Sequence, residues 1–83
     1  MSYYFTPSAL RQLKKLPLEI QHRIIKKLDF YCAQSEPLQF AENLVKFEIG
    51  SYRFRVGDYR VIFDIEDDNL LILLVGHRRN IYQ

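Results

Sequence analysis

Apolar residues recur along the chain with two different periods, which divide it into a helical part followed by a strand-forming part. The aromatic run Tyr3–Phe5 is typical of a short opening strand. Apolar residues then recur every three to four positions, as on one face of an α-helix. From Phe47 onward apolar and polar side chains alternate, as in a strand buried on one face. The pattern therefore predicts a strand, a pair of helices and then a small sheet.

The first helix is predicted over residues 7–16. Thr6 suits the N-cap, and Pro7 suits the first turn because its missing N–H would have no helical partner there. Leu10 and Leu13 are expected to point inward. The helix should end before the next proline, which makes the turn to a second helix very short.

The second helix is predicted over residues 18–34. Its apolar positions have spacings of four, four and three, which gives one buried stripe. These positions are Ile20, Ile24, Leu28 and Tyr31. The two helices are interpreted as an αα-hairpin, and residues 38–45 as a loop or an irregular helical turn.

Three strands are predicted in the second half, over residues 52–56, 59–65 and 70–75. Gly57-Asp58 is typical of a tight hairpin turn, since glycine readily takes a positive φ. The strand at 70–75 is apolar on both faces, so it should lie inside the sheet. Helices packed on one face of a small antiparallel sheet give an α+β fold, with one domain expected over residues 1–83.

The turn at Gly57-Asp58 fixes a testable register, in which Arg55 lies opposite Arg60. One face of the hairpin is then apolar and is expected to pack on the helices. It consists of Tyr52, Phe54, Val56, Tyr59, Val61, Phe63 and Ile65. The opposite face carries Arg53, Arg55 and Arg60.

Like charges directly opposite each other destabilise a sheet, so this arginine pattern needs an explanation. One interpretation is an anion site, because guanidinium groups offer planar pairs of donors to phosphate. The other is a solvated polar face on which the arginines pair with Asp64 or Glu66. A second basic run, Gly76 to Arg79, follows the interior strand and favours the anion site.

Such a site suits RNA transesterification, in which a 2′-hydroxyl attacks the adjacent phosphate. Arginines stabilise the negative charge that develops, but they stay protonated and cannot act as bases. His77 and Tyr82 are the candidate proton carriers. Tyr82 would need the arginines to lower its pKa from about 10. No residues at metal-ligand spacing are present, so neither a metal nor another cofactor is expected.

Composition limits the remaining classes. The single cysteine, Cys32, cannot form an internal disulfide, and the first residues lack the pattern of a signal peptide. No apolar run is long enough to span a membrane, so the protein is expected to be cytoplasmic. The formal net charge is only +2, but basic residues are concentrated on the predicted helices. With Arg79, the candidate RNA- or ribosome-binding residues are Arg11, Lys14, Lys15, Arg23, Lys26 and Lys27.

The stretches YRFRVGDYRVIFDI and LLILLVGHRRNIYQ resemble the C-terminal sheet of toxins of the RelE/ParE superfamily, in particular the RelE branch. The order of strand and helical hairpin also fits, so the resemblance covers essentially the whole chain. It implies a ribosome-dependent endoribonuclease that cuts messenger RNA and forms a hetero-oligomer with an antitoxin. In the family, basic residues of the hairpin activate the phosphate; some members have lysine where this chain has Arg53 and Arg55.

The resemblance also implies roles for residues near the C-terminus. Arg78 corresponds to an arginine that follows the interior strand, Tyr82 to the proposed general base, and His77 to a position that is often histidine. Two other functions stay open. ParE-type members poison DNA gyrase without cutting RNA, and a member without activity would act only as a protein-binding module.

Overall fold

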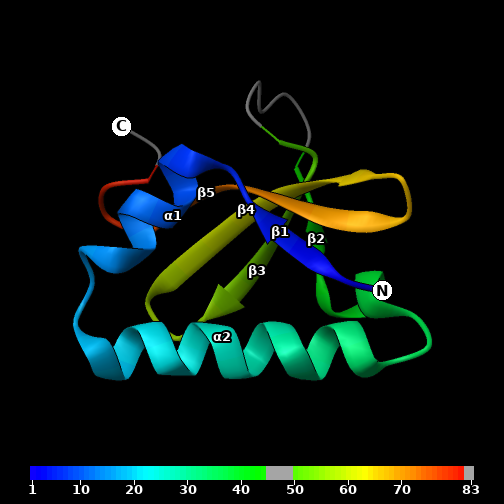
Figure 1. The fold of residues 1–83 in the computed structure, drawn as a ribbon, viewed down its shortest axis with the longest axis horizontal. Helices are drawn as coiled ribbons and strands as arrows, with labels where there is room; N and C mark the ends of the chain where they lie inside the picture. The colour runs from blue at the N-terminus through cyan, green and yellow to red at the C-terminus, as the bar shows by residue number, and fades with distance from the viewer. Residues whose placement is uncertain (45–49, 82–83) are drawn as a thin grey trace.

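The computed structural model describes residues 1–44 and 50–81, which form a five-stranded sheet with two helices on one side (Figure 1). The elements in chain order are β1 (Tyr3–Phe5), α1 (Pro7–Lys14), α2 (Leu18–Ala33), the 3-10 helix η1 (Pro37–Phe40), β2 (Glu42–Asn43), β3 (Tyr52–Val56), β4 (Tyr59–Glu66) and β5 (Asn69–His77). Within the described ranges, no helix combines the length and hydropathy that crossing a bilayer requires.

The strand order is β1-β5-β4-β3-β2, and neighbouring strands are antiparallel except that β1 runs parallel to β5. The predicted α+β class is confirmed, and β5 lies inside the sheet as expected. The sheet is mixed rather than antiparallel throughout, because the first strand of the chain adds to the last one. Periodicity within a strand does not reveal this direction. β2, which was interpreted as loop or helical turn, is a short additional strand.

The ends of the helices follow local hydrogen bonds. Thr6 is the N-cap of α1, where its hydroxyl accepts a hydrogen bond from the Ala9 N–H at 3.1 Å. α1 ends at Lys14, two residues before the predicted end, and α2 ends at Ala33, one residue early. In the short turn between the helices, the Gln21 side chain donates to the carbonyl of Leu16 at 2.7 Å.

The inward face of α1 differs from the prediction at one position. Ala9 and Leu13 are buried, four residues apart on one side of the helix, whereas Leu10 is 38% exposed. The prediction for Leu10 was wrong because the small Ala9 brings α1 close to the sheet and takes the inward position. The stripe predicted for α2 is confirmed, since Ile24, Leu28 and Tyr31 are buried and Ile20 is half-buried.

The hydrophobic core lies between the two helices and the sheet. Phe54 and Phe63 are fully buried there and stack with ring centroids 4.5 Å apart, and Tyr31 of α2 approaches Phe54 at 4.3 Å. The predicted apolar face of the hairpin is confirmed, because all seven of its residues belong to this core or pack against it. We call this the helix-facing side of the sheet.

A bulge in β5 changes the sheet at its centre. Ile62 pairs with Leu74 and Phe63 with Ile72, so Leu73 is an extra residue on β5. Beside the bulge, the Val75 N–H donates to the Gln12 side chain of α1 at 2.9 Å. The bulge also explains why the buried residues of β5 change their spacing from two to three after Ile72.

Candidate functional site

The arginines of the β3–β4 hairpin lie on the side of the sheet that faces away from the helices. The predicted register is confirmed: Arg55 lies opposite Arg60, and Arg53 opposite Ile62. Because side chains alternate along a strand, Arg53, Arg55 and Arg60 share the side opposite to Phe54 and Val61. We call it the arginine side. The first condition for an anion site, three guanidinium-bearing residues on one side of one hairpin, is therefore met.

An anion already lies between two of these arginines, and it belongs to the protein. Glu42 on β2 is the strand partner of Arg53. Its Oε2 accepts a hydrogen bond from Arg53 Nη2 at 2.7 Å, and its Oε1 lies 2.6 Å from Arg55 Nε. The carboxylate beside these arginines thus comes from Glu42, whereas the sequence had pointed to Asp64 or Glu66. Asp64 accepts a hydrogen bond from the Ser51 N–H instead.

The electrostatic surroundings of Glu42 are strongly positive. The hydrogen bond from Arg53 holds the pKa of the Glu42 carboxyl below its ordinary value, and the charges of Arg53, Arg55 and Arg60 act in the same direction. Glu42 is therefore ionised at neutral pH. The arrangement combines one negative charge with three positive ones, so it keeps a net attraction for further anions.

Arg60 is held differently from its two neighbours. Its side chain turns back along the hairpin, where Nη1 donates to the carbonyls of Gly57 and Tyr59, both at 2.9 Å. The residue is only 8% exposed. Arg60 therefore stabilises the turn and contributes its charge from a nearly buried position.

The hairpin turn is where basic residues from other elements arrive. The backbone N–H of Arg78 donates to the Asp58 carbonyl at 2.8 Å, and its Nε lies 3.7 Å from Asp58 Oδ1. From α2, Arg23 packs so closely on the turn that a Cβ at Gly57 would meet its Nη1 at 3.0 Å. Gly57 has φ +60, as its place in the turn predicted. Arg78 is thus close to the hairpin, and Arg23 reaches it from the helical layer.

The structure does not bring His77 to the arginine side. His77 pairs with Tyr59 on the helix-facing side, and the two rings meet edge to face at 5.3 Å. Its Nδ1 accepts a hydrogen bond from the Arg79 N–H at 3.1 Å. The basic run from Gly76 to Arg79 was expected to emerge at one end of the arginine side, but the strand register places Gly76, not His77, opposite Arg60. Tyr82 lies outside the described residues.

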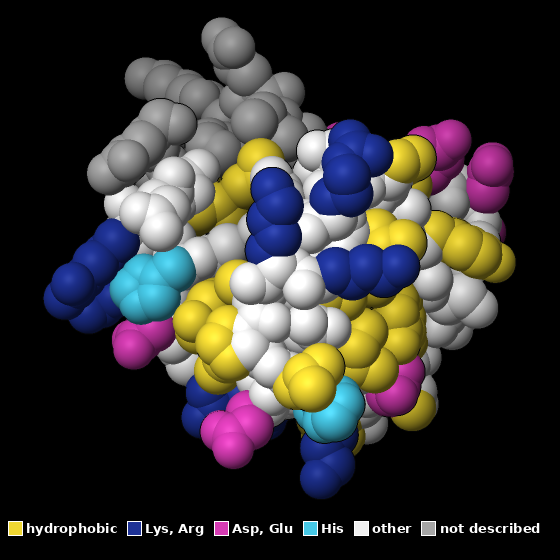
Figure 2. Space-filling model, turned by 60° about the vertical axis from the view of Figure 1, so that its left-hand side comes forward, with side chains coloured by type: hydrophobic (Ala, Val, Ile, Leu, Met, Phe, Trp, Pro, Cys, Tyr) yellow, Lys and Arg dark blue, Asp and Glu magenta, His cyan; other side chains and the backbone are white. Residues whose placement is uncertain are grey.

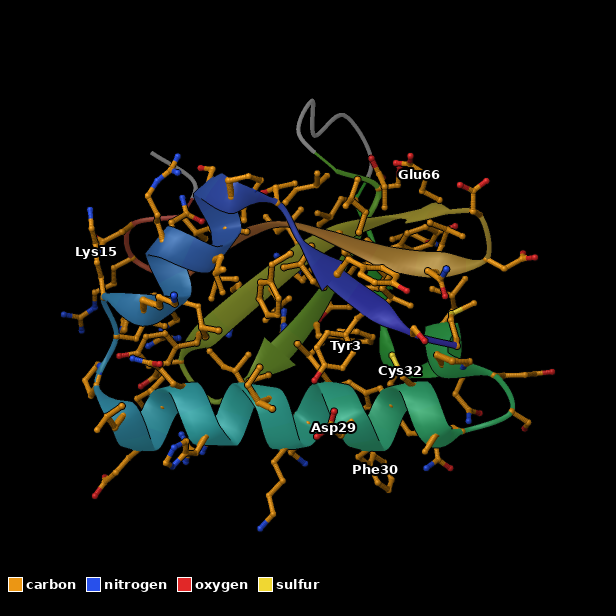
Figure 3. All side chains as sticks on the ribbon, in the orientation of Figure 1. Tyr3, Lys15, Asp29, Phe30, Cys32 and Glu66 are labelled. Carbon is orange, nitrogen blue, oxygen red and sulfur yellow. The ribbon has the colours of Figure 1, made fainter. Side chains whose placement is uncertain are left out.

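The basic residues of the helices are exposed, as an RNA-binding surface requires. These residues, together with Arg79, are Arg11, Lys14, Lys15, Arg23, Lys26 and Lys27. Figure 2 shows one side of the molecule, on which Lys and Arg side chains are spread among hydrophobic and neutral ones. On α2, Arg23, Lys26, Lys27 and Phe30 line a shallow hollow of about 310 Å³. Phe30 points away from the sheet, as Figure 3 shows.

Glu42 was not found from the sequence. It lies on a strand of two residues, Glu42–Asn43, which has no alternating pattern and is built from residue types that are rare in strands. The available clue is that Glu42 is an acidic residue that precedes a basic hairpin in the sequence. The sequence alone does not show that Glu42 pairs with that hairpin, because the two are separated along the chain. Among residues 1–44 and 50–81, no three His, Cys, Asp or Glu side chains are placed to hold a metal ion.

Comparisons with known proteins agree over nearly the whole chain. A family model described as the ParE toxin of the type II toxin–antitoxin system parDE matches residues 3–82. Toxin RelG of Mycobacterium tuberculosis is 35% identical over 81 residues, which cover 95% of this chain and 92% of RelG. Toxin RelE3 of Methanocaldococcus jannaschii is 32% identical over 85 residues, with coverages of 99% and 96%.

A solved structure gives the same result for the fold. The crystal structure of the RelBE2 toxin–antitoxin complex from Mycobacterium tuberculosis contains a chain that superposes with a TM-score of 0.77. The two chains are 33% identical, and the match covers 93% of this chain and 96% of the other.

Proposed function

Because the chain belongs to the RelE/ParE superfamily of toxins from type II toxin–antitoxin systems, we propose that it inhibits translation as an endoribonuclease that cuts messenger RNA on the ribosome. The observation that carries this proposal is the group of guanidiniums on one hairpin, with Arg53 and Arg55 already gathered around a carboxylate. A site that binds one oxyanion in this way suits the phosphate of RNA. The similarity to toxins named RelG and RelE3 supports the same branch.

The proposed reaction is a transesterification within the RNA. The 2′-oxygen attacks the adjacent phosphorus, the bond to the 5′-oxygen breaks, and the products end in a 2′,3′-cyclic phosphate and a 5′-hydroxyl. Arg53, Arg55, Arg60 and Arg78 stabilise the charge on the phosphorane oxygens. Tyr82, as phenolate, takes the proton of the 2′-hydroxyl, and solvent water supplies the proton that the leaving 5′-oxygen needs. The chemistry needs no metal ion.

Two partners follow from this proposal. The exposed basic residues of α1 and α2 bind ribosomal RNA, which makes binding weaken steeply with salt because counterions are released. A cognate antitoxin forms a hetero-oligomer with the toxin and keeps it inactive, in keeping with the RelBE2 relative, which was solved as a toxin–antitoxin complex. Acidic side chains of that antitoxin would neutralise the arginine side. The place of action is the cytoplasm, where ribosomes translate.

The test uses purified protein, ribosomes and a defined messenger RNA. Primer extension should reveal cuts at fixed codon positions that need the ribosome, and analysis of the fragments should find 2′,3′-cyclic phosphate ends. A cut that leaves a 5′-phosphate would refute the proposed chemistry.

The same preparation separates the two alternatives. DNA breaks that depend on gyrase, without RNA cleavage, would assign the protein to ParE-type action. Absence of both activities, in protein that still binds its antitoxin, would leave a protein-binding module.

A further inference from the structure

We propose that Glu42 is a built-in competitor for the phosphate site, so that an incoming phosphate reaches Arg53 and Arg55 by displacing its carboxylate. This inference rests on the proposed function only for the identity of the incoming anion as RNA phosphate. The exchange of one anion for another on the two arginines is a property of this chain's own residues.

The geometry of Glu42 resembles that of a bound ligand. Its two oxygens are used separately: Oε2 lies 2.7 Å from Arg53 Nη2, and Oε1 lies 2.6 Å from Arg55 Nε. A phosphate likewise presents two oxygens from one centre to two guanidinium groups. Glu42 and an RNA phosphate would therefore use the same donors, and they cannot use them at the same time.

The contact of Glu42 with Arg55 is of the kind that exchanges readily, whereas its contact with Arg53 is partly buried. The Glu42 side chain is 43% exposed and that of Arg55 is 58% exposed, so water and salt screen the ion pair. The strand that carries it pairs with β3 over two residues only, Glu42 with Arg53 and Asn43 with Tyr52. Rotation of the Glu42 side chain would withdraw its carboxylate from both arginines.

The competitor explains how the site tolerates its own charge. Arg55 lies opposite Arg60, an arrangement that is unfavourable without an anion. Glu42 supplies that anion in the free protein. A small free anion must then replace a partner that is attached to the chain, whereas an RNA held by further contacts can displace it. The site thus discriminates against isolated phosphate ions.

The experiment measures the dissociation constant of inorganic phosphate by NMR, from the Nε–H signals of Arg53 and Arg55. Glu42→Gln keeps the size of the side chain and removes the charge, and it should bind phosphate about threefold to tenfold more tightly than wild type. Glu66→Gln, an exposed residue at the far end of β4 (Figure 3), removes one charge of the same type and should bind like wild type. Unchanged or weaker binding in folded Glu42→Gln would overturn the inference.

If Glu42→Gln folds poorly, a measurement on the wild-type protein can still test whether phosphate displaces Glu42. During the phosphate titration, the side-chain carboxyl ¹³C signal of Glu42 should move toward that of an exposed glutamate, with the same dissociation constant as the arginine signals. Arginine signals that respond while Glu42 stays bound would contradict displacement.

Failure of the inference can be told from failure of the proposed function. If the wild-type protein does not cut messenger RNA but Glu42→Gln binds phosphate more tightly than wild type, the inference about Glu42 stands and the proposed ribonuclease activity fails. The reverse result is also distinguishable. If cleavage depends on the arginines but Glu42→Gln leaves the phosphate affinity unchanged, the proposed ribonuclease activity stands and the inference about Glu42 fails.

Discussion

The two sides of the sheet are built on different principles. On the helix-facing side, Phe54, Val61 and Phe63 are fully buried against α1 and α2. On the arginine side, Arg53 and Arg55 share Glu42, and Arg60 donates to carbonyls of its own hairpin. Apolar packing accepts any neighbour of suitable shape, whereas each guanidinium needs a particular oxygen at a particular place. One side therefore specifies the fold, and the other is the side that we propose for binding.

The energies of the two sides differ in the same way. Burying one large apolar side chain contributes about 1.5–3 kcal/mol, while an exposed ion pair contributes about 0–1 kcal/mol. The stability of the domain thus depends mainly on the helix-facing side. We therefore expect the arginine side to exchange its partners without unfolding the protein, as the proposed binding surface requires.

The sharpest way to test this division is to remove an exposed arginine. Arg78→Ala should lower ribosome-dependent cleavage about 10²–10³-fold, because one donor to the developing negative charge is lost. The melting temperature should stay close to that of wild type, since the Arg78 side chain is half exposed and lies 3.7 Å from Asp58. Single-turnover cleavage and thermal unfolding are measured on the same preparation.

The matched control for that prediction is the adjacent Arg79→Ala, which removes the same charge from an exposed position and should cost cleavage far less. Equal losses in the two variants would show that only net charge matters. A large fall in melting temperature for Arg78→Ala would break the separation of binding from stability.

The difference between the sides also decides what the sequence could predict. The turn at Gly57-Asp58 predicted the register of Arg55 with Arg60. Alternation predicted the core positions of Phe54 and Phe63, because burial repeats with the pleat. Neither Glu42 nor the carbonyl partners of Arg60 could be predicted, since hydrogen-bond partners depend on distant segments and on side-chain rotation. His77 was misplaced for a similar reason: its neighbours in sequence are arginines, but its register partner is Tyr59.

The arginine side also contains a tightly packed position, Gly50. A substitution there tests whether the stability of the protein depends on the helix-facing side alone. A Cβ at Gly50 would lie 2.6 Å from Cγ2 of the fully buried Ile62 and 3.3 Å from Cδ1 of Leu73. Gly50→Ala should therefore destabilise the protein by about 1–3 kcal/mol through overpacking. Urea unfolding measures the change.

Ser51→Ala is the control for Gly50→Ala. Ser51 is exposed, and its contact with Asp64 uses the backbone N–H, so its unfolding free energy should stay within about 0.5 kcal/mol of wild type. If Gly50→Ala is as stable as this control, the packing around Ile62 contributes little to the fold.

A smaller effect is expected where a polar side chain supports the helix-facing side. Gln12→Ala removes the acceptor of the Val75 N–H beside the bulge of β5, and Val75 is almost fully buried. An amide left without its acceptor should cost about 1–2 kcal/mol in unfolding free energy. Gln39→Ala on η1, an exposed glutamine, should be close to neutral, and equal stability of the two variants would exclude a structural role for Gln12.

The smallest effect concerns the joint between β1 and α2, where Tyr3 donates a hydrogen bond to Asp29 Oδ1 at 2.7 Å (Figure 3). Burial and this hydrogen bond raise the pKa of Tyr3 to about 12, from about 10 in the unfolded chain. Its contribution is therefore complete below pH 10, and it falls between pH 10 and 12 because the unfolded chain loses the proton first. Tyr3→Phe should be less stable by about 0.5 kcal/mol at neutral pH. This difference should disappear as the pH rises above 10 and then reverse, because the unfolded wild-type chain ionises while the folded one does not. Parallel unfolding curves at several pH values measure it. Tyr4 is an exposed tyrosine on the same strand, so the stability difference between Tyr4→Phe and wild type should show no such change with pH. A stability difference for Tyr3→Phe that stays constant with pH would mean that ionisation of Tyr3 does not contribute to alkaline unfolding.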